Sequence, residues 1–226
     1  MDDGLLSVAQ AAARLGVSPS RVRQRIADGS LAARRVGSQW GIRPQALDDG
    51  APRRSRPLSS RMSWALIDLL SGSPPAASPA ERVRLRSRVE RLREAADPAS
   101  LLRSWASSRA ERLELSVAAP DMDDLRADER LHLSGLSVPD SGVIAHDVIE
   151  GYVFSRDVEG LLDDYFLVRP DGARGNVFLH VIHEEAQGVP RAIDIAWPLV
   201  AIDLAEHSGA RERERAAELL REMLPT

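Results

Sequence analysis

The strongest constraint on the fold lies near the N-terminus, where start and stop signals for helices follow one another closely. Ser7 predicts the N-cap of a first helix that ends at Gly16, because glycine commonly follows the last helical turn. Ser18 and Pro19 predict the start of a second helix, since serine caps helices and proline suits the first helical position. Two helices joined by so short a turn are expected to pack against each other.

A two-stranded hairpin is expected directly after the second helix. Val22 and Ile26 form the apolar face of that helix, and Gly29 is expected to end it. Residues 31–36 and 39–42 are typical of two short strands around a Gly-Ser turn. A helix, a short turn, a second helix and a hairpin, in this order, predict a small winged helix-turn-helix domain.

Charge divides the chain at the place where this pattern ends. The chain has 226 residues and a net charge of −4, but residues 1–62 are basic, with 11 Arg against five Asp. Residues 63–226 are acidic, with 19 Arg against 29 acidic residues. Residues 51–62 are rich in Pro, Arg and Ser and have no apolar period. We therefore expect a basic domain at 1–50, a basic linker at 51–62 and a larger domain at 63–226.

The larger domain is predicted to be α+β, with helices first, strands in the middle and helices last. Helices are expected at about residues 63–70, 78–96, 98–105 and 157–164, and two more between 198 and 224. Strands are expected at residues 112–117, 132–138, 148–154, 165–170 and 176–182.

Composition excludes several classes of function. Cysteine is absent, which excludes disulfides, thiol catalysis and Cys-based metal sites and fits a reducing cytoplasm. No apolar run reaches the roughly 18 residues of a membrane helix, and no signal peptide opens the chain. Sequence motifs for phosphate, dinucleotide, zinc-protease and serine-hydrolase sites are absent too. We expect a cytoplasmic protein that is not an enzyme, spans no membrane and binds no cofactor.

The second helix has the size of a helix that reads the major groove of DNA. Glutamine pairs with adenine and arginine with guanine, so Arg23 and Gln24 are the expected base-reading residues. Arg25 lies nearer the buried edge and is expected to reach a phosphate. The candidate DNA-binding residues of the helix and of the predicted wing are Ser18, Ser20, Arg21, Arg23, Gln24, Arg25, Arg34, Arg35, Ser38 and Arg43.

Other polar groups have simpler interpretations. A basic helix can be only a solvated face, but the agreement of caps, turn spacing, hairpin and local charge favours DNA. Trp40 is expected to pack the hairpin onto the helices. The six arginines between residues 82 and 93 are expected to cover their own apolar stripe and to pair with nearby glutamates, rather than to grip phosphates or an acidic partner.

No metal site is expected in the larger domain. His180 and His183 fall on opposite faces of a predicted strand, so they cannot share a metal ion there. Asp203 and His207 lie four residues apart on a predicted helix, and we expect an exposed side-chain pair rather than a metal or acid/base site.

The N-terminal stretch LLSVAQAAARLGVSPSRVRQRIADGSLAARRVGSQWGI resembles the excisionase/MerR-like helix-turn-helix family. The matching features are the SVAQAAARLGVS opening, the VRQRI helix, the DGSL turn and the RVGSQWGI hairpin. The chain departs from many members at Arg25, where they carry an aromatic residue or leucine. The resemblance implies a domain that binds double-stranded DNA.

Three further segments are similar to actinobacterial AbiEi-type antitoxins. They are RPLSSRMSWALIDLLSG, EGYVFS and PLVAIDLAEHSGARERERAAELLREML. The resemblance implies a regulator that binds the operator of its own operon, and a C-terminal domain that counters a nucleotidyltransferase-like toxin as its protein partner. Two alternatives stay open from the residues themselves: a transcription factor whose C-terminal domain senses a small ligand, and an enzyme targeted by its helix-turn-helix.

Overall fold

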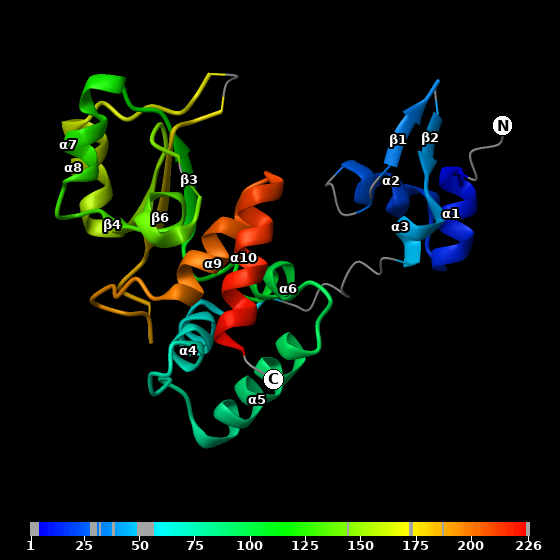
Figure 1. The fold of residues 1–226 in the computed structure, drawn as a ribbon, viewed down its shortest axis with the longest axis horizontal. Helices are drawn as coiled ribbons and strands as arrows, with labels where there is room; N and C mark the ends of the chain where they lie inside the picture. Colours follow the sequence, from blue (N-terminus) through cyan, green and yellow to red (C-terminus); the bar gives the residue numbers. More distant parts are fainter. Residues whose placement is uncertain are drawn as a thin grey trace. The chain divides into compact units, whose positions relative to one another are not determined.

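The computed structural model describes residues 5–27, 31, 33–37, 39–48, 57–143, 145–171, 174–186 and 188–224. The chain forms two compact units, Met1–Ser55 and Arg56–Thr226, and each is described by itself (Figure 1). Together they are a mixed α+β structure, as the sequence predicts. In the described part of the chain, no helix is long and apolar enough to cross a membrane.

The first unit contains the predicted pair of helices and the hairpin. Its elements are helices α1 (Val8–Leu15), α2 (Pro19–Ala27) and α3 (Pro44–Asp48) and strands β1 (Ala33–Val36) and β2 (Gln39–Ile42), which pair antiparallel. Ser7 and Gln10 form a capping box at the start of α1, and Gly16 ends it in the left-handed conformation at φ 64°. The predicted end of α2 at Gly29 lies outside the described residues.

Small and branched apolar side chains form the core of this unit. The buried members are Ala11, Ala12, Val22, Leu31, Ile42 and Leu47. Leu6, ahead of α1, exchanges two backbone hydrogen bonds with Ile42 and so ties the N-terminal segment to β2. The unit is therefore held together by three helices and a hairpin around a few apolar residues.

The second unit is built on a four-stranded sheet with helices on both faces. Its helices are α4 (Ser60–Leu70), α5 (Pro79–Arg93), α6 (Pro98–Trp105), α7 (Met122–Arg126), α8 (Ser155–Asp164), α9 (Trp197–Glu206) and α10 (Ala210–Met223). Its strands are β3 (Glu111–Leu115), β4 (His132–Leu133), β5 (Ile149–Phe154) and β6 (Val177–Ile182). The strand order is β3-β6-β5-β4, with β5 and β6 parallel and the outer pairs antiparallel.

Alternating residues of the central strands supply two apolar cores. Ile149 and Val153 of β5 pack with Leu125 and Leu161, from α7 and α8, on one face of the sheet. Tyr152 and Phe154 point to the other face, where the core is built with α4, α5, α6, α9 and α10. Because both faces are covered, all six residues of β5 and of β6 are buried.

Two predicted strands are corrected by the structure. Residues 165–170 form no strand beyond one bridge, in which Val168 pairs with Ser116. Pro170 follows closely, and proline has no N–H with which to continue such a ladder. The strand predicted at 132–138 is only His132–Leu133, because a 3₁₀ turn over Gly135–Ser137 replaces the rest.

Helix boundaries differ in smaller ways. Helix α4 begins at Ser60 with Ser59 as its N-cap, so the last residues assigned to the linker belong to a helix. Helix α5 starts at its predicted capping box of Ser78 and Glu81 but ends at Arg93, three residues early. The short helices α3 and α7 were not predicted, and they are too short to show a clear apolar period.

Candidate nucleic-acid interface

Helix α2 presents a polar face opposite its buried side. Val22 is fully buried, whereas Ser20, Arg23 and Gln24 are exposed, as predicted from the helical period. Ser18 is also exposed, and its hydroxyl accepts a hydrogen bond from the backbone N–H of Arg21 at 3.3 Å. Ser18 therefore acts as the helix cap that its position predicts, and the face beyond it faces solvent.

Two candidate DNA-binding side chains on this helix contact each other. The Arg21 Nη1 donates a hydrogen bond to the Gln24 Oε1 at 2.7 Å. A bidentate contact between Gln24 and adenine needs that same oxygen as an acceptor. Because an amide oxygen has two lone pairs, this bond leaves one acceptor position of Gln24 open.

Arg25 lies at the edge of the exposed face, as the sequence indicates. It is half-buried, and its carbonyl accepts a hydrogen bond from the Leu31 N–H at 2.9 Å. This bond anchors the end of α2 to the residue before the hairpin. Arg25 is thus placed between the core and solvent rather than on the outward face.

The hairpin carries the other predicted arginines. Arg34 and Arg35 are exposed on β1, and Arg43 is exposed just after β2. Arg35 lies opposite Trp40 in the strand register, with its guanidinium carbon 5.6 Å from the ring centre. Trp40 is half-buried, so one role of its ring is to support Arg35. Ser38, predicted at the tip, lies outside the described residues.

The first unit is basic. Residues 1–55 of the sequence hold nine arginines and five aspartates. An excess of this sign attracts a polyanion such as the phosphate backbone of DNA.

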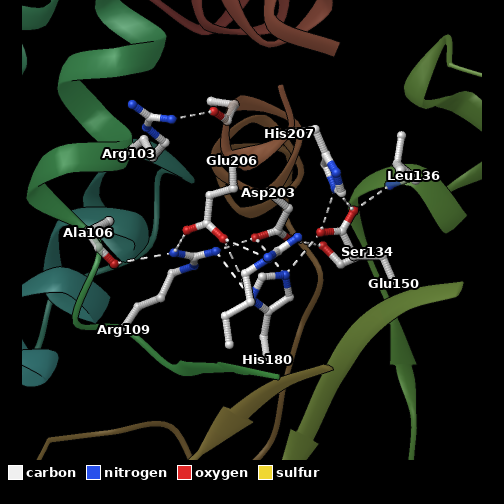
Figure 2. Close-up of polar contacts among 12 residues, drawn as sticks. Arg103, Ala106, Arg109, Ser134, Leu136, Glu150, His180, Asp203, Glu206 and His207 are labelled. Atoms are coloured by element: carbon white, nitrogen blue, oxygen red, sulfur yellow. Dashed lines mark hydrogen bonds and ion pairs between the residues drawn. The ribbon is translucent and has the colours of Figure 1, made fainter. Parts of the chain in front are cut away.

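The second unit holds a different polar cluster, the buried polar network, which links the sheet to α9 (Figure 2). Its members are Arg109, Ser134, Glu150, Tyr152, His180, Asp203, Glu206 and His207. The Arg109 guanidinium donates to Glu206 at 2.7 Å, to Asp203 at 2.5 Å and to the Tyr152 hydroxyl at 2.6 Å. One cation thus contacts two acidic side chains and a phenol.

Glu150 forms the second centre of the network. Its carboxylate lies 3.1 Å from the His180 Nε2 and 2.9 Å from the His207 Nε2, and it accepts from the Leu136 N–H at 2.9 Å. Burial by itself raises the pKa of a carboxyl, but the hydrogen bonds from the two histidines outweigh it and hold the pKa of Glu150 well below its usual range. Glu150 is therefore an ionised, fully hydrogen-bonded group in the core.

Asp203 behaves in the opposite way. Burial raises the pKa of the Asp203 carboxyl, although His180 and Arg109 oppose the shift. The Tyr152 hydroxyl donates to its Oδ1 at 2.8 Å, and the Ser134 hydroxyl donates to its Oδ2. The expected exposed pair of Asp203 and His207 is thus wrong, because both side chains are buried and each binds a different part of the network.

The polar residues that the structure describes in this network are not arranged as a metal site. Within the described ranges, no set of three His, Asp or Glu side chains is placed to hold a metal ion. His180 faces the buried network, whereas His183 lies just beyond β6 and pairs with Glu111 at 3.3 Å. The two histidines are therefore apart, as the sequence predicts.

The structure confirms only part of the prediction that the arginines of α5 pair with nearby glutamates. Arg93 pairs with Glu90 at 2.6 Å, but Glu81 pairs with Arg61 of α4 rather than with an arginine of its own helix. Arg88 and Arg91 lie over the ring of Trp105, with guanidinium carbons 4.7 Å and 5.2 Å from the ring centre. The guanidinium groups of these arginines pack against α6, although Arg88 is only half-buried and Arg91 is exposed.

One family of known domains matches the N-terminal unit. The family described as "Helix-turn-helix domain" matches residues 5–49, from ahead of α1 to the end of α3. No curated protein and no solved structure shows significant similarity to the chain. Residues 5–49 therefore form a helix-turn-helix domain, which indicates a DNA-binding protein that regulates transcription.

Proposed function

We propose that the protein is a sequence-specific transcriptional regulator that binds the operator of its own operon through a winged helix-turn-helix. The observation that carries this proposal is the exposed face of α2, with Ser20, Arg23 and Gln24 opposite buried Val22, in a segment that matches a helix-turn-helix domain. In this arrangement α2 enters the major groove, and the hairpin of β1 and β2 acts as the wing.

The two sets of arginines have different tasks in this proposal. Arg23 and Gln24 read base edges, which differ from one base pair to another. Arg34, Arg35 and Arg43 neutralise phosphates, which are the same in every sequence. Arg21 orients Gln24 through the hydrogen bond between them, so that the Gln24 amide is positioned for adenine.

A mobility-shift titration of the full chain on the DNA upstream of its own gene tests this proposal. Binding should weaken steeply with salt, with a log–log slope of about −0.9 for each neutralised phosphate. A scrambled duplex of equal length serves as the control for sequence preference. No complex with the upstream DNA, or a complex insensitive to salt, contradicts the proposal.

We further propose that the second unit is the antitoxin part of a toxin–antitoxin pair with a nucleotidyltransferase-like toxin. The support is the resemblance of three segments to AbiEi-type antitoxins, of which the last forms α9 and α10. Its residues Asp203 and His207 belong to the buried polar network, so this resemblance concerns the fold of the unit. The acidic charge of residues 63–226 suits a basic protein partner better than DNA.

Co-expression with the product of the adjacent gene tests the antitoxin role. The full chain and a variant with Arg23→Ala and Gln24→Ala should both protect cells from the toxin, whereas only the full chain should repress the operon. Loss of protection in the variant shows that the two activities are not separable. No toxicity of the neighbouring gene product favours the alternative of a ligand-sensing regulator.

A further inference from the structure

The sheet of the second unit has one long edge. It ends at β4, which is two residues long, and at β3, which is five. Among the described residues, the only strand paired with β3 is β6, and the one backbone pairing beyond its outer side is the bridge from Ser116 to Val168. An open edge of this length presents backbone groups that another strand can pair with, whereas a two-residue edge does not.

The backbone directions along this edge follow from Ser116. Its N–H and C=O both bond to Val168, at 2.8 Å and 3.2 Å, and therefore not to β6. Backbone groups of successive strand residues point to alternate sides. Arg112 and Glu114 therefore direct their N–H and C=O groups outward like Ser116, while Leu113 between them bonds toward β6.

The sequence of this edge is complementary to itself. Reading from 111 to 115, β3 is Glu-Arg-Leu-Glu-Leu. When two copies pair antiparallel about a two-fold axis at Leu113, Arg112 of each copy lies opposite Glu114 of the other. In this register, residue 112 of each copy exchanges backbone hydrogen bonds with residue 114 of the other copy. This agrees with the outward directions of the N–H and C=O groups of both residues.

The surface beside this edge has a cleft and exposed apolar side chains. A cleft of about 530 Å³ runs beside β3 from Arg112 to Leu115, with Leu162, Leu167, Arg169 and Pro170 on its other side. Val168, next to this edge, is 59% exposed. Phe166, two residues earlier, is 81% exposed and has a φ of 50°, which costs a phenylalanine backbone energy.

We propose that β3 pairs antiparallel with the β3 of a second copy of this chain, about a two-fold axis at Leu113. The pairing joins two four-stranded sheets into one and covers the apolar residues beside the edge. Each dimer then carries two helix-turn-helix units, as a DNA site with two half-sites requires. The pairing itself does not depend on DNA binding and is tested without DNA.

Charged residues on an exposed strand edge can instead prevent the edge from pairing with another strand. For that purpose the positive and negative residues need no particular order along the strand. Here their order is the one that self-pairing needs. Contacts within the chain turn both side chains toward β6, with the Arg112 guanidinium carbon 4.4 Å from the centre of the Phe178 ring, so pairing with a second copy redirects them. The Arg112 Nε lies 3.6 Å from the Glu206 Oε2, and the Glu114 Oε1 accepts from the Gly175 N–H at 2.9 Å. Two like charges at 112 and 114 would oppose the same register.

Sedimentation of the full chain over a range of concentrations measures the dimer. The native chain should dimerise, and R112E and E114R should each raise the dissociation constant about tenfold or more, because two attractive pairs become two repulsive ones. An equimolar mixture of the two variants should dimerise again, since each strand then meets opposite charges. R93E makes the same charge change on α5 and should leave the dissociation constant unchanged.

A single-cysteine variant gives an independent measurement. The chain has no cysteine, and two Leu113 residues facing each other in a non-hydrogen-bonded pair have Cα atoms about 4.5 Å apart, within the range of a disulfide. Leu113→Cys should therefore form a linked dimer under mild oxidation, while Val83→Cys, at an exposed position on α5, should not.

Three results overturn the proposal. They are a native chain that stays monomeric, a dimer that both charge swaps leave unchanged, and a mixture of folded variants that fails to associate. If a charge-swap variant does not fold, the two single-cysteine variants provide the test. Equal cross-linking at positions 113 and 83 would contradict pairing through β3. An association only with a different protein through this edge also contradicts self-pairing.

Discussion

Arg109 and Asp203 form an ion pair that is fully buried, with the Arg109 Nη2 2.5 Å from the Asp203 Oδ1. Their side chains are 1% and 0% exposed. Arg109 lies just ahead of β3, and Asp203 lies on α9, so the pair joins the edge of the sheet to the helix that covers it. Water cannot replace either partner, which makes the pair a sensitive point of the second unit.

Removal of the cation should destabilise the protein strongly. Arg109→Met leaves Asp203 and Glu206 buried without their shared guanidinium, so we expect the free energy of unfolding to fall by about 3–5 kcal/mol. Urea denaturation followed by circular dichroism measures this. Arg93→Ala breaks an exposed pair with Glu90 and should cost no more than about 1 kcal/mol. Equal losses for the two variants would contradict the role of the network.

Glu150 should make stability depend on acid pH. Its pKa in the folded protein lies below the ordinary value, so its ionised form stabilises the native state above about pH 4.5, and this contribution is lost as the pH falls further. Glu150→Gln should lower stability at pH 7 and flatten the decline in acid. Urea midpoints between pH 7 and pH 3 measure both effects.

The pKa of Asp203 is shifted in the opposite direction from that of Glu150, so Asp203 provides a control. Burial raises the pKa of Asp203 in the folded protein above its value in the unfolded chain. The protonated form of Asp203 therefore stabilises the native state in acid, and this contribution is lost as the pH rises through the pKa of the folded protein. Asp203→Asn should therefore not flatten the acid decline as Glu150→Gln does. An unchanged acid profile for Glu150→Gln would refute the assignment of this decline to Glu150.

Gly135 should tolerate no side chain. Its φ is 51°, and a Cβ there would lie 2.0 Å from the Glu150 Oε2 and 3.0 Å from the Asp203 Cβ. Gly135→Ala should cost about 3 kcal/mol or more, from backbone strain together with overpacking of the network. Gly72 has a similar φ of 77° with open space around it, so Gly72→Ala should cost only the strain, about 1–2 kcal/mol. Thermal unfolding of the two variants distinguishes these costs.

Substitutions in α2 should change DNA specificity, whereas substitutions in the hairpin should not. Gln24→Ala should lose about 1–3 kcal/mol of discrimination at one base pair, as a bidentate contact would. Arg34→Ala should weaken binding to all sequences equally and make the salt slope shallower by about 0.9. Selection of binding sites from random duplexes measures the first effect, and salt titration measures the second. An unchanged site preference in Gln24→Ala would show that another face reads the bases.

The helix ends were predictable because their signals are local. Ser7 with Gly16, and Ser78 with Glu81, lie within one or two turns of the backbone groups they satisfy, and the structure confirms each of these caps. The exposed face of α2 was predictable for the same reason, since burial of Val22 alone orients a helix with a period of 3.6 residues. Strand lengths were less predictable, because pairing partners such as Val168 and Ser116 come from distant segments.

By itself, the sequence determined the helix-turn-helix, the α+β class of the second unit and the boundaries of most helices. Only the tertiary structure decided where the polar side chains of the second unit lie. Every residue of α9 from Pro198 to Ala205 is buried, so no apolar stripe distinguishes an inner face from an outer one. Asp203 finds Arg109, 94 residues earlier, only when the helix packs on the sheet, and no local pattern records such a contact.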